Sequence, residues 1–96
     1  MNTKSKFASN SRNNGFAMTF ANGWTISVQW GANTYSDNRN KDPFTALSPI
    51  PMDSTTAEIA IWNDVDHEMM DFGDDNVKGY CDANEVASWI ERVSKF

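Results

Sequence analysis

The segment from Gly15 to Gly31, GFAMTFANGWTISVQWG, constrains the fold more than any other part of this 96-residue sequence. Each half alternates large apolar side chains with small or polar ones, which is typical of strands with one buried face. The apolar positions are Phe16, Met18 and Phe20 in the first half and Trp24, Ile26, Val28 and Trp30 in the second. We therefore expect a β-hairpin near the start of the fold.

The length of the hairpin turn decides whether the two apolar rows share a face. A two-residue Asn22-Gly23 turn would place Phe20 opposite Thr25, and the rows would then lie on different faces. A three-residue turn over residues 21–23 places Phe20 opposite Trp24, so that both rows lie on one face. The last turn residue then needs a positive φ, which glycine adopts without strain. The sequence predicts the three-residue turn, with Met18 opposite Ile26 and Phe16 opposite Val28.

The C-terminal residues predict one helix. Asp82 and Glu85 form an Asp variant of the capping box, in which each side chain accepts a hydrogen bond from the other residue's backbone N–H. Apolar side chains then recur at helical spacing and form a stripe that suits one face of a sheet. They are Val86, Trp89, Ile90, Val93 and Phe96.

Two more strands are predicted between the hairpin and the helix. Residues 57–62, AEIAIW, alternate in the strand period, and residues 69–72 are expected to pair back on them as a fourth strand. Residues 77–80 are expected to form at most a short extended piece. The predicted fold over residues 15–96 is therefore a single α+β domain. It has an antiparallel four-stranded sheet of two hairpins, with one C-terminal helix packed on one face.

Two segments fall outside these elements. Residues 1–14 are rich in Asn, Ser and Lys, so we expect a flexible N-terminal tail, or an edge segment around Phe7. Residues 31–55 form a long connection that holds all three prolines, and long loops in compact domains are often functional. Its apolar side chains, Tyr35 and Phe44 among them, either pack on the sheet or form an exposed contact patch. Trp62 is either an exposed anchor for a partner or is covered by this loop.

The charge of the chain is unevenly placed. The net charge is −5, but residues 1–50 carry five basic and two acidic residues, whereas residues 51–96 carry three basic and eleven acidic residues. The two halves therefore have net charges of +3 and −8. An acidic second half disfavours direct nucleic-acid binding and favours partners with a basic surface, such as proteins with nucleic-acid-binding grooves.

Several classes of protein are not expected from the composition. The sequence has no apolar run near the ~18 residues of a membrane-spanning helix, and the first residues lack the apolar core of a secretory signal. The single cysteine, Cys81, excludes an internal disulfide and a multi-cysteine metal site. A reducing, cytoplasmic location is consistent with one free thiol.

Six carboxylates lie close together in the second half, at Asp64, Asp66, Glu68, Asp71, Asp74 and Asp75. Their spacing begins like a calcium loop, but Met69 takes the place of the required glycine and Asp75 that of the bidentate glutamate. Zinc binding through His67 would lack paired cysteines. We predict no metal or cofactor, and interpret the run as a solvated turn or as a recognition surface.

Nothing in the sequence predicts catalysis. Cys81 stands at a helix start, where a thiol pKa can be lowered, but only His67 is available as its base. A partly buried structural cysteine is the favoured interpretation. The sequence contains no glycine-rich phosphate loop and no nucleophile elbow. An enzyme is therefore not expected.

Two stretches resemble a family of small accessory proteins from tailed phages. The first is Asn14-Gly15-Phe16-Ala17-Met18-Thr19-Phe20, followed by Asn22-Gly23 and Thr25-Ile26-Ser27-Val28-Gln29-Trp30-Gly31. The second is Val77-Lys78-Gly79-Tyr80-Cys81, followed by Glu85-Val86-Ala87 and Trp89-Ile90. The resemblance covers about half of the chain, at both ends. It brings no activity and no site residues, but it implies a phage accessory protein made in the cytoplasm of a bacterial host.

The sequence and the resemblance together support three hypotheses. The first is a non-enzymatic protein that binds and blocks a basic surface of a host protein, with an anti-CRISPR or other anti-defence inhibitor as its sharpest version. Its expected contact residues are the six carboxylates with Tyr35, Phe44 and Trp62. The second is a protein that sequesters a small molecule or nucleotide in a pocket under residues 31–55, through Arg39 and Lys41. The third is a self-associating virion or assembly component. The oligomeric state is left open.

Overall fold

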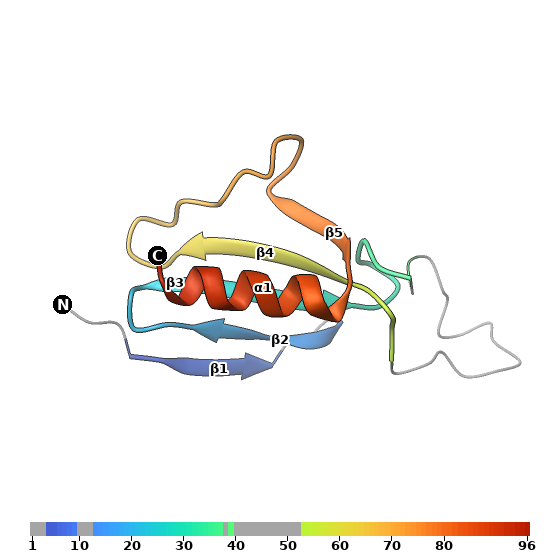
Figure 1. Cartoon of the computed structure of the whole chain (residues 1–96), viewed down its shortest axis with the longest axis horizontal. Helices are drawn as coiled ribbons and strands as arrows, with labels where there is room; N and C mark the ends of the chain where they lie inside the picture. Colours follow the sequence, from blue (N-terminus) through green and yellow to red (C-terminus); the bar gives the residue numbers. More distant parts are fainter. Residues whose placement is uncertain (1–3, 10–12, 38, 40–52) are drawn as a thin grey trace, which may run out of the picture.

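The computed structural model describes residues 4–9, 13–37, 39 and 53–96. In this part of the chain, five antiparallel strands form one sheet in the order β1-β2-β3-β4-β5, and one helix lies across a face of it (Figure 1). The elements are β1 Lys6–Ser9, β2 Asn14–Thr19, β3 Trp24–Trp30, β4 Ala57–Asn63, β5 Val77–Cys81 and α1 Ala83–Ser94. The predicted α+β class, with one antiparallel sheet and a C-terminal helix, is confirmed.

The β2–β3 hairpin has the predicted register. It pairs Met18 with Ile26 and Phe16 with Val28. The turn is closed by hydrogen bonds from the Phe20 N–H to the Trp24 carbonyl oxygen (2.9 Å) and from the Gly23 N–H to the Phe20 carbonyl oxygen (3.0 Å). Gly23 has a φ of 87°, which is the positive dihedral that a three-residue turn requires. The apolar rows of both strands therefore point to the same side of the sheet.

The sheet has five strands, so the predicted number of four is wrong. The extra edge strand, β1, lies within residues 1–14, for which the composition favours a tail. Its one large apolar side chain, Phe7, is 76% exposed. Backbone pairing with β2, from Lys6–Thr19 to Ser9–Phe16, defines the strand. Because no β1 side chain is buried, the sequence shows no alternation there, although the alternative of an edge segment around Phe7 agrees with the structure.

At the other side of the sheet, β5 pairs with β4 in place of residues 69–72. Residues 69–72 therefore do not form the predicted fourth strand. Among the described residues, their pairing with β4 is limited to a single bridge between Trp62 and Met69. The Asp71 carboxylate accepts a hydrogen bond from the Gly73 N–H (2.7 Å), and this turn leads the chain away from β4. β5 then returns to pair Cys81 with Ala57, with an irregularity further along the register.

The core lies between the sheet and α1. Its buried side chains come from β3 and β4, from the end of β5 and from the helix. They are Ile26, Val28, Ala57, Ile59, Ile61, Cys81 and Val93. Full burial contributes about 1.5–3 kcal/mol for a side chain such as Val or Ile, so this cluster holds the helix on the sheet.

Local sequence signals determine where α1 begins and which face it buries. The Glu85 N–H donates to the Asp82 carboxylate (2.8 Å) and the Asp82 N–H donates to the Glu85 carboxylate (3.5 Å), which confirms the predicted capping box. On the buried face, the Trp89 ring packs edge-on against Phe72, with 5.4 Å between the ring centroids. The helix is therefore joined both to the sheet and to the connection between β4 and β5.

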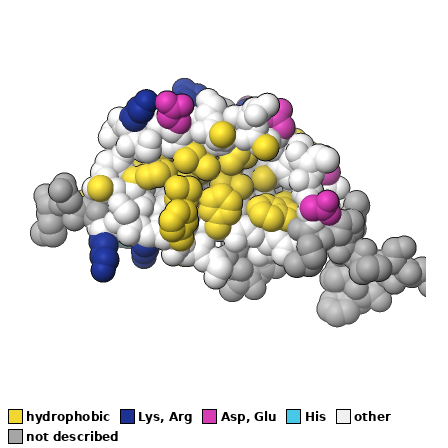
Figure 2. Space-filling model, turned by 60° about the horizontal axis from the view of Figure 1, so that its bottom comes forward, with side chains coloured by type: hydrophobic (Ala, Val, Ile, Leu, Met, Phe, Trp, Pro, Cys, Tyr) yellow, Lys and Arg dark blue, Asp and Glu magenta, His cyan; other side chains and the backbone are white. Residues whose placement is uncertain are grey.

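The helix covers only part of the apolar face of the sheet. Among these elements, α1 contacts β3, β4 and β5 but neither β1 nor β2. Phe16, Met18 and Phe20 are consequently only partly buried, and Figure 2 shows hydrophobic side chains gathered at the centre of this side of the molecule. Within the described ranges, no helix has the length and apolar character needed to cross a membrane.

Candidate functional site

The six predicted carboxylates lie in the connection from β4 to β5, and residues 64–75 are termed the acidic segment. The chain turns directly after β4. The Asn63 side-chain oxygen accepts a hydrogen bond from the Val65 N–H (2.8 Å), and the Asp66 carboxylate accepts one from the Glu68 N–H (2.9 Å). His67 has a φ of 61°, in the left-handed region that turns use. Such side-chain-closed turns give the segment a defined backbone without a regular helix or strand.

Contacts along its length attach the acidic segment to the rest of the fold. The Asp64 N–H donates to the Gly23 carbonyl oxygen (2.8 Å), and the Met70 N–H donates to a carbonyl oxygen of β4 (2.8 Å). The Phe72 ring packs against Trp89 of α1. Because these contacts are spread along the segment, they hold its carboxylates on a fixed framework.

Five of the six carboxylates are exposed. They are Asp66, Glu68, Asp71, Asp74 and Asp75. The acidic segment itself contains no Lys or Arg. No Lys or Arg in the described ranges forms an ion pair with these carboxylates, whereas Glu91 is paired with Lys95 on the helix. The segment therefore presents negative charge that a basic partner would neutralise.

Asp64 differs from the other five because it is half-buried and bonded to the sheet. Its carboxylate accepts a hydrogen bond from the Thr25 hydroxyl (3.0 Å), whose oxygen lies 2.8 Å from that of Thr19. A hydroxyl has one proton, so Thr19 must donate to Thr25 when Thr25 donates to Asp64. Both threonines are buried, on the face of the sheet that α1 does not cover. Asp64 thus helps to fix the position of the acidic segment.

Apolar side chains accompany the charges. Trp62 is half-buried, stands opposite Thr25 in the β3–β4 register and bridges to Met69. Met69 is 38% exposed and Val65 is 78% exposed. Val65 was not among the predicted contact residues, although an apolar residue between two aspartates in a turn is the signal that would have indicated it. Together these side chains are candidate contacts beside the carboxylates.

The structure does not bring Tyr35 to the acidic segment. Tyr35 follows the end of β3 and lies beside the start of β4. The acidic segment begins at the other end of β4 and leads into β5, whose first residue pairs with Ala60 in the middle of β4. The Tyr35 carbonyl oxygen accepts a hydrogen bond from the Tyr80 N–H (2.8 Å). The Arg39 guanidinium lies 4.1 Å from the centre of the Tyr35 ring. Phe44 and Lys41 lie outside the described residues.

Neither a metal centre nor a catalytic cysteine is assembled by the described residues. No three His, Cys, Asp or Glu side chains among them are grouped so that they could hold a metal ion. Cys81 pairs with Ala57 at the start of β4, while His67 follows its end. The Cys81 side chain is 1% exposed. Burial, followed by the negative charge of Glu85, raises the pKa of its thiol, so this cysteine is protonated and unreactive at neutral pH.

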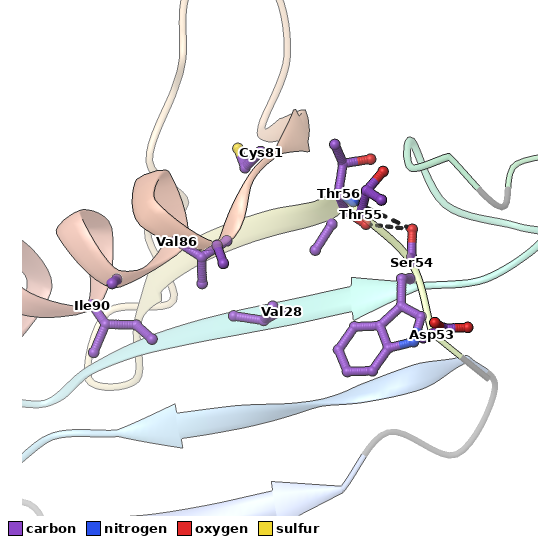
Figure 3. Close-up of a pocket in the computed structure, with 12 residues that line it drawn as sticks. Val28, Asp53, Ser54, Thr55, Thr56, Cys81, Val86 and Ile90 are labelled. Carbon is purple, nitrogen blue, oxygen red and sulfur yellow. Dashed lines mark hydrogen bonds between the residues drawn. The ribbon is translucent and has the colours of Figure 1, made fainter. Parts of the chain in front are cut away.

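A cavity of about 410 Å³ lies between the N-terminal half of α1 and the sheet (Figure 3). Val28, Ala57, Cys81, Val86 and Ile90 line it with apolar surface, and residues 53–56 lie at its rim. It lies beside the end of the 31–55 connection, under which the sequence analysis placed a pocket. Arg39 is not one of the described lining residues, and its guanidinium stacks on Tyr35 instead.

No protein-family model, curated protein or solved structure matches this chain. Two features of the described residues are candidate sites: the acidic segment between β4 and β5, and the cavity beside α1.

Proposed function

We propose that this protein is a non-enzymatic binding protein whose acidic segment occupies a basic surface on another protein. The supporting observation is that five carboxylates are exposed on a segment attached to β3, β4 and α1. A segment that is ordered before binding loses less conformational freedom in the complex. The charges are therefore presented at a low entropic cost.

The apolar side chains of the segment give this surface a second source of affinity. Complementary charge mainly speeds association and excludes wrong partners, whereas buried apolar contacts account for much of the binding energy. Val65 and Met69 are the exposed apolar side chains nearest in sequence to the carboxylates. A partner that combines basic residues with a shallow apolar pocket fits this arrangement.

The resemblance to tailed-phage accessory proteins suggests where such a partner is found. In the bacterial cytoplasm, nucleic-acid-binding grooves are basic surfaces that an acidic protein can block. The sharpest form of the proposal is an inhibitor of a nucleic-acid-guided defence complex, an anti-CRISPR or a related anti-defence protein. In this role the chain contacts the host protein and not the nucleic acid. A virion or assembly component would instead form a defined oligomer in solution.

The test is affinity capture from a bacterial host lysate with tagged wild type and a charge variant. The variant carries Asp66→Asn, Glu68→Gln, Asp71→Asn, Asp74→Asn and Asp75→Asn. Asparagine keeps a side-chain oxygen that can accept the backbone hydrogen bonds of the turns, so the substitutions remove charge with little change of structure. We expect wild type to capture one host protein complex and to release it as salt is raised, since salt screens exposed charges.

We expect the charge variant not to capture this complex from the same lysate. The control is Asp53→Asn with Glu91→Gln, which removes two carboxylates outside the acidic segment and should capture as well as wild type. Capture that is equal for wild type and the charge variant, or no capture by either, would contradict the proposal.

A further inference from the structure

The two halves of α1 pack differently on the sheet. At the C-terminal end, Phe96 meets Trp24 edge-on at 5.1 Å between ring centroids, and Val93 has no exposed surface. At the N-terminal end, Val86 is only partly buried, and Ala83 and Ala87 are exposed and line a cavity. The N-terminal half of the helix therefore packs less closely on the sheet than the C-terminal half, and the cavity lies there.

The size and walls of the cavity match those of small-molecule sites. A volume of about 410 Å³ lies within the ~300–1,000 Å³ typical of ligand pockets. It exceeds the ~150 Å³ apolar cavity that holds one benzene molecule. Val86 and Ile90 point from the helix toward Val28 of β3 (Figure 3), so a ligand would lie between two apolar layers.

The polar groups at the rim are already used by the chain. The Ser54 hydroxyl donates to the Thr56 carbonyl oxygen (2.7 Å), as the dashed lines in Figure 3 show. The Thr55 hydroxyl donates to the Asp37 carboxylate, and the Thr56 hydroxyl oxygen accepts from the Asp37 N–H (3.0 Å). Among the described residues, the Ser54 and Thr55 hydroxyls therefore already donate within the chain, whereas the Thr56 hydroxyl only accepts. Recognition must come mainly from the apolar walls.

We propose that this cavity binds a small uncharged apolar molecule of about two fused rings, or a short acyl chain. The described lining residues include no Lys or Arg, which disfavours nucleotides and other phosphate-bearing ligands. The site is separate from the acidic segment, since it lies beside the start of β4 and the N-terminal half of α1. Ligand binding in the cavity therefore does not depend on the proposed function. A small molecule could occupy the cavity while a partner is bound to the acidic segment.

The test is a fluorescence titration with N-phenyl-1-naphthylamine, an uncharged probe that joins a naphthalene to a phenyl ring and becomes bright in apolar sites. We expect saturable binding to wild type. Ala87→Phe adds a ring on the cavity side of the helix and should weaken binding by about tenfold or more, because the ring occupies space that the probe needs. Ser88→Phe adds the same ring at an exposed helix position outside the cavity lining and should leave the affinity within about twofold.

Methyl NMR of the wild-type protein locates the probe without any substitution. The largest shifts are expected at Val28, Val86 and Ile90, while Val65 and Val77 stay unchanged. Two results would overturn the proposal. One is the absence of saturable binding. The other is a shift pattern centred on Met18, which would place the probe on the open face of β1 and β2.

Discussion

Gly79 and Tyr80 show how single residues fit β5 against the loop that follows β3. A Cβ atom on Gly79 would lie 2.4 Å from the Tyr35 Cβ, closer than real side chains approach. Tyr80 has a φ of 55°, which is rare for a bulky residue, and its N–H bonds to the Tyr35 carbonyl oxygen. The absence of a side chain at Gly79 thus leaves room for Tyr35, which is distant in the sequence. Composition alone does not reveal such a contact.

Cys81 provides a prediction at the residue scale. Burial and the charge of Glu85 raise the pKa of its thiol above 9.0 in the folded state, so the folded protein holds this proton more tightly than the unfolded chain. The resulting stabilisation is present below about pH 9 and is lost as the pH rises through the folded pKa. The free energy of unfolding of wild type should therefore fall relative to that of Cys81→Ala above this pH. Urea unfolding at a series of pH values measures it, and a constant difference between the two proteins would contradict it.

How much of the fold the sequence predicts also depends on particular residues. Gly23 and the alternating side chains around it determine the register of the first hairpin, and Asp82 with Glu85 determines the start of the helix. These signals are local. β1 has no buried side chain, and residues 69–72 resemble a strand until Asp71 bonds to the Gly73 N–H. Backbone pairing with β2 decided the first case and a local turn decided the second, and the alternation of side chains shows neither.

At the scale of elements, Trp89 couples α1 to the acidic segment. Its ring packs against Phe72 of the segment and lies 4.1 Å from the Arg92 guanidinium. Trp89→Ala should lower the free energy of unfolding by about 3 kcal/mol, the low end for such truncations, because Trp89 is only half-buried. Trp89→Phe keeps an edge-on aromatic contact and should lose less than about half as much. Urea unfolding checks both, and a loss below about 1 kcal/mol for the alanine variant would mean that this contact does not hold the helix.

The candidate site was only partly predictable at this scale. The sequence indicated the acidic segment because six carboxylates occur in twelve residues without a compensating cation. It could not show that Asp64 is bonded to Thr25, or that Tyr35 lies beside the start of β4. Both facts follow from strand order and register. The cavity could not be predicted either, because its walls come from α1, β3 and the start of β4, which meet only in the folded chain.

At the scale of the whole molecule, the location of the charge matters more than its total. The chain has a net charge of −5, and its second half carries eleven of the thirteen acidic residues. If binding depended only on net charge, removing any two carboxylates would have the same effect. If the acidic segment is the contact surface, the loss of affinity depends on where the removed carboxylates lie, because exposed charges interact mainly within a Debye length of about 8–10 Å.

Affinity for the captured host protein tests this directly, with two variants of equal net charge. Glu68→Gln with Asp74→Asn removes two exposed carboxylates of the acidic segment, whereas Asp53→Asn with Glu91→Gln removes two elsewhere. Titration calorimetry at low salt should give about a tenfold or greater loss of affinity for the first pair and less than about a twofold change for the second. Equal losses would show that only net charge attracts the partner, and a loss confined to the second pair would place the contact surface elsewhere on the fold.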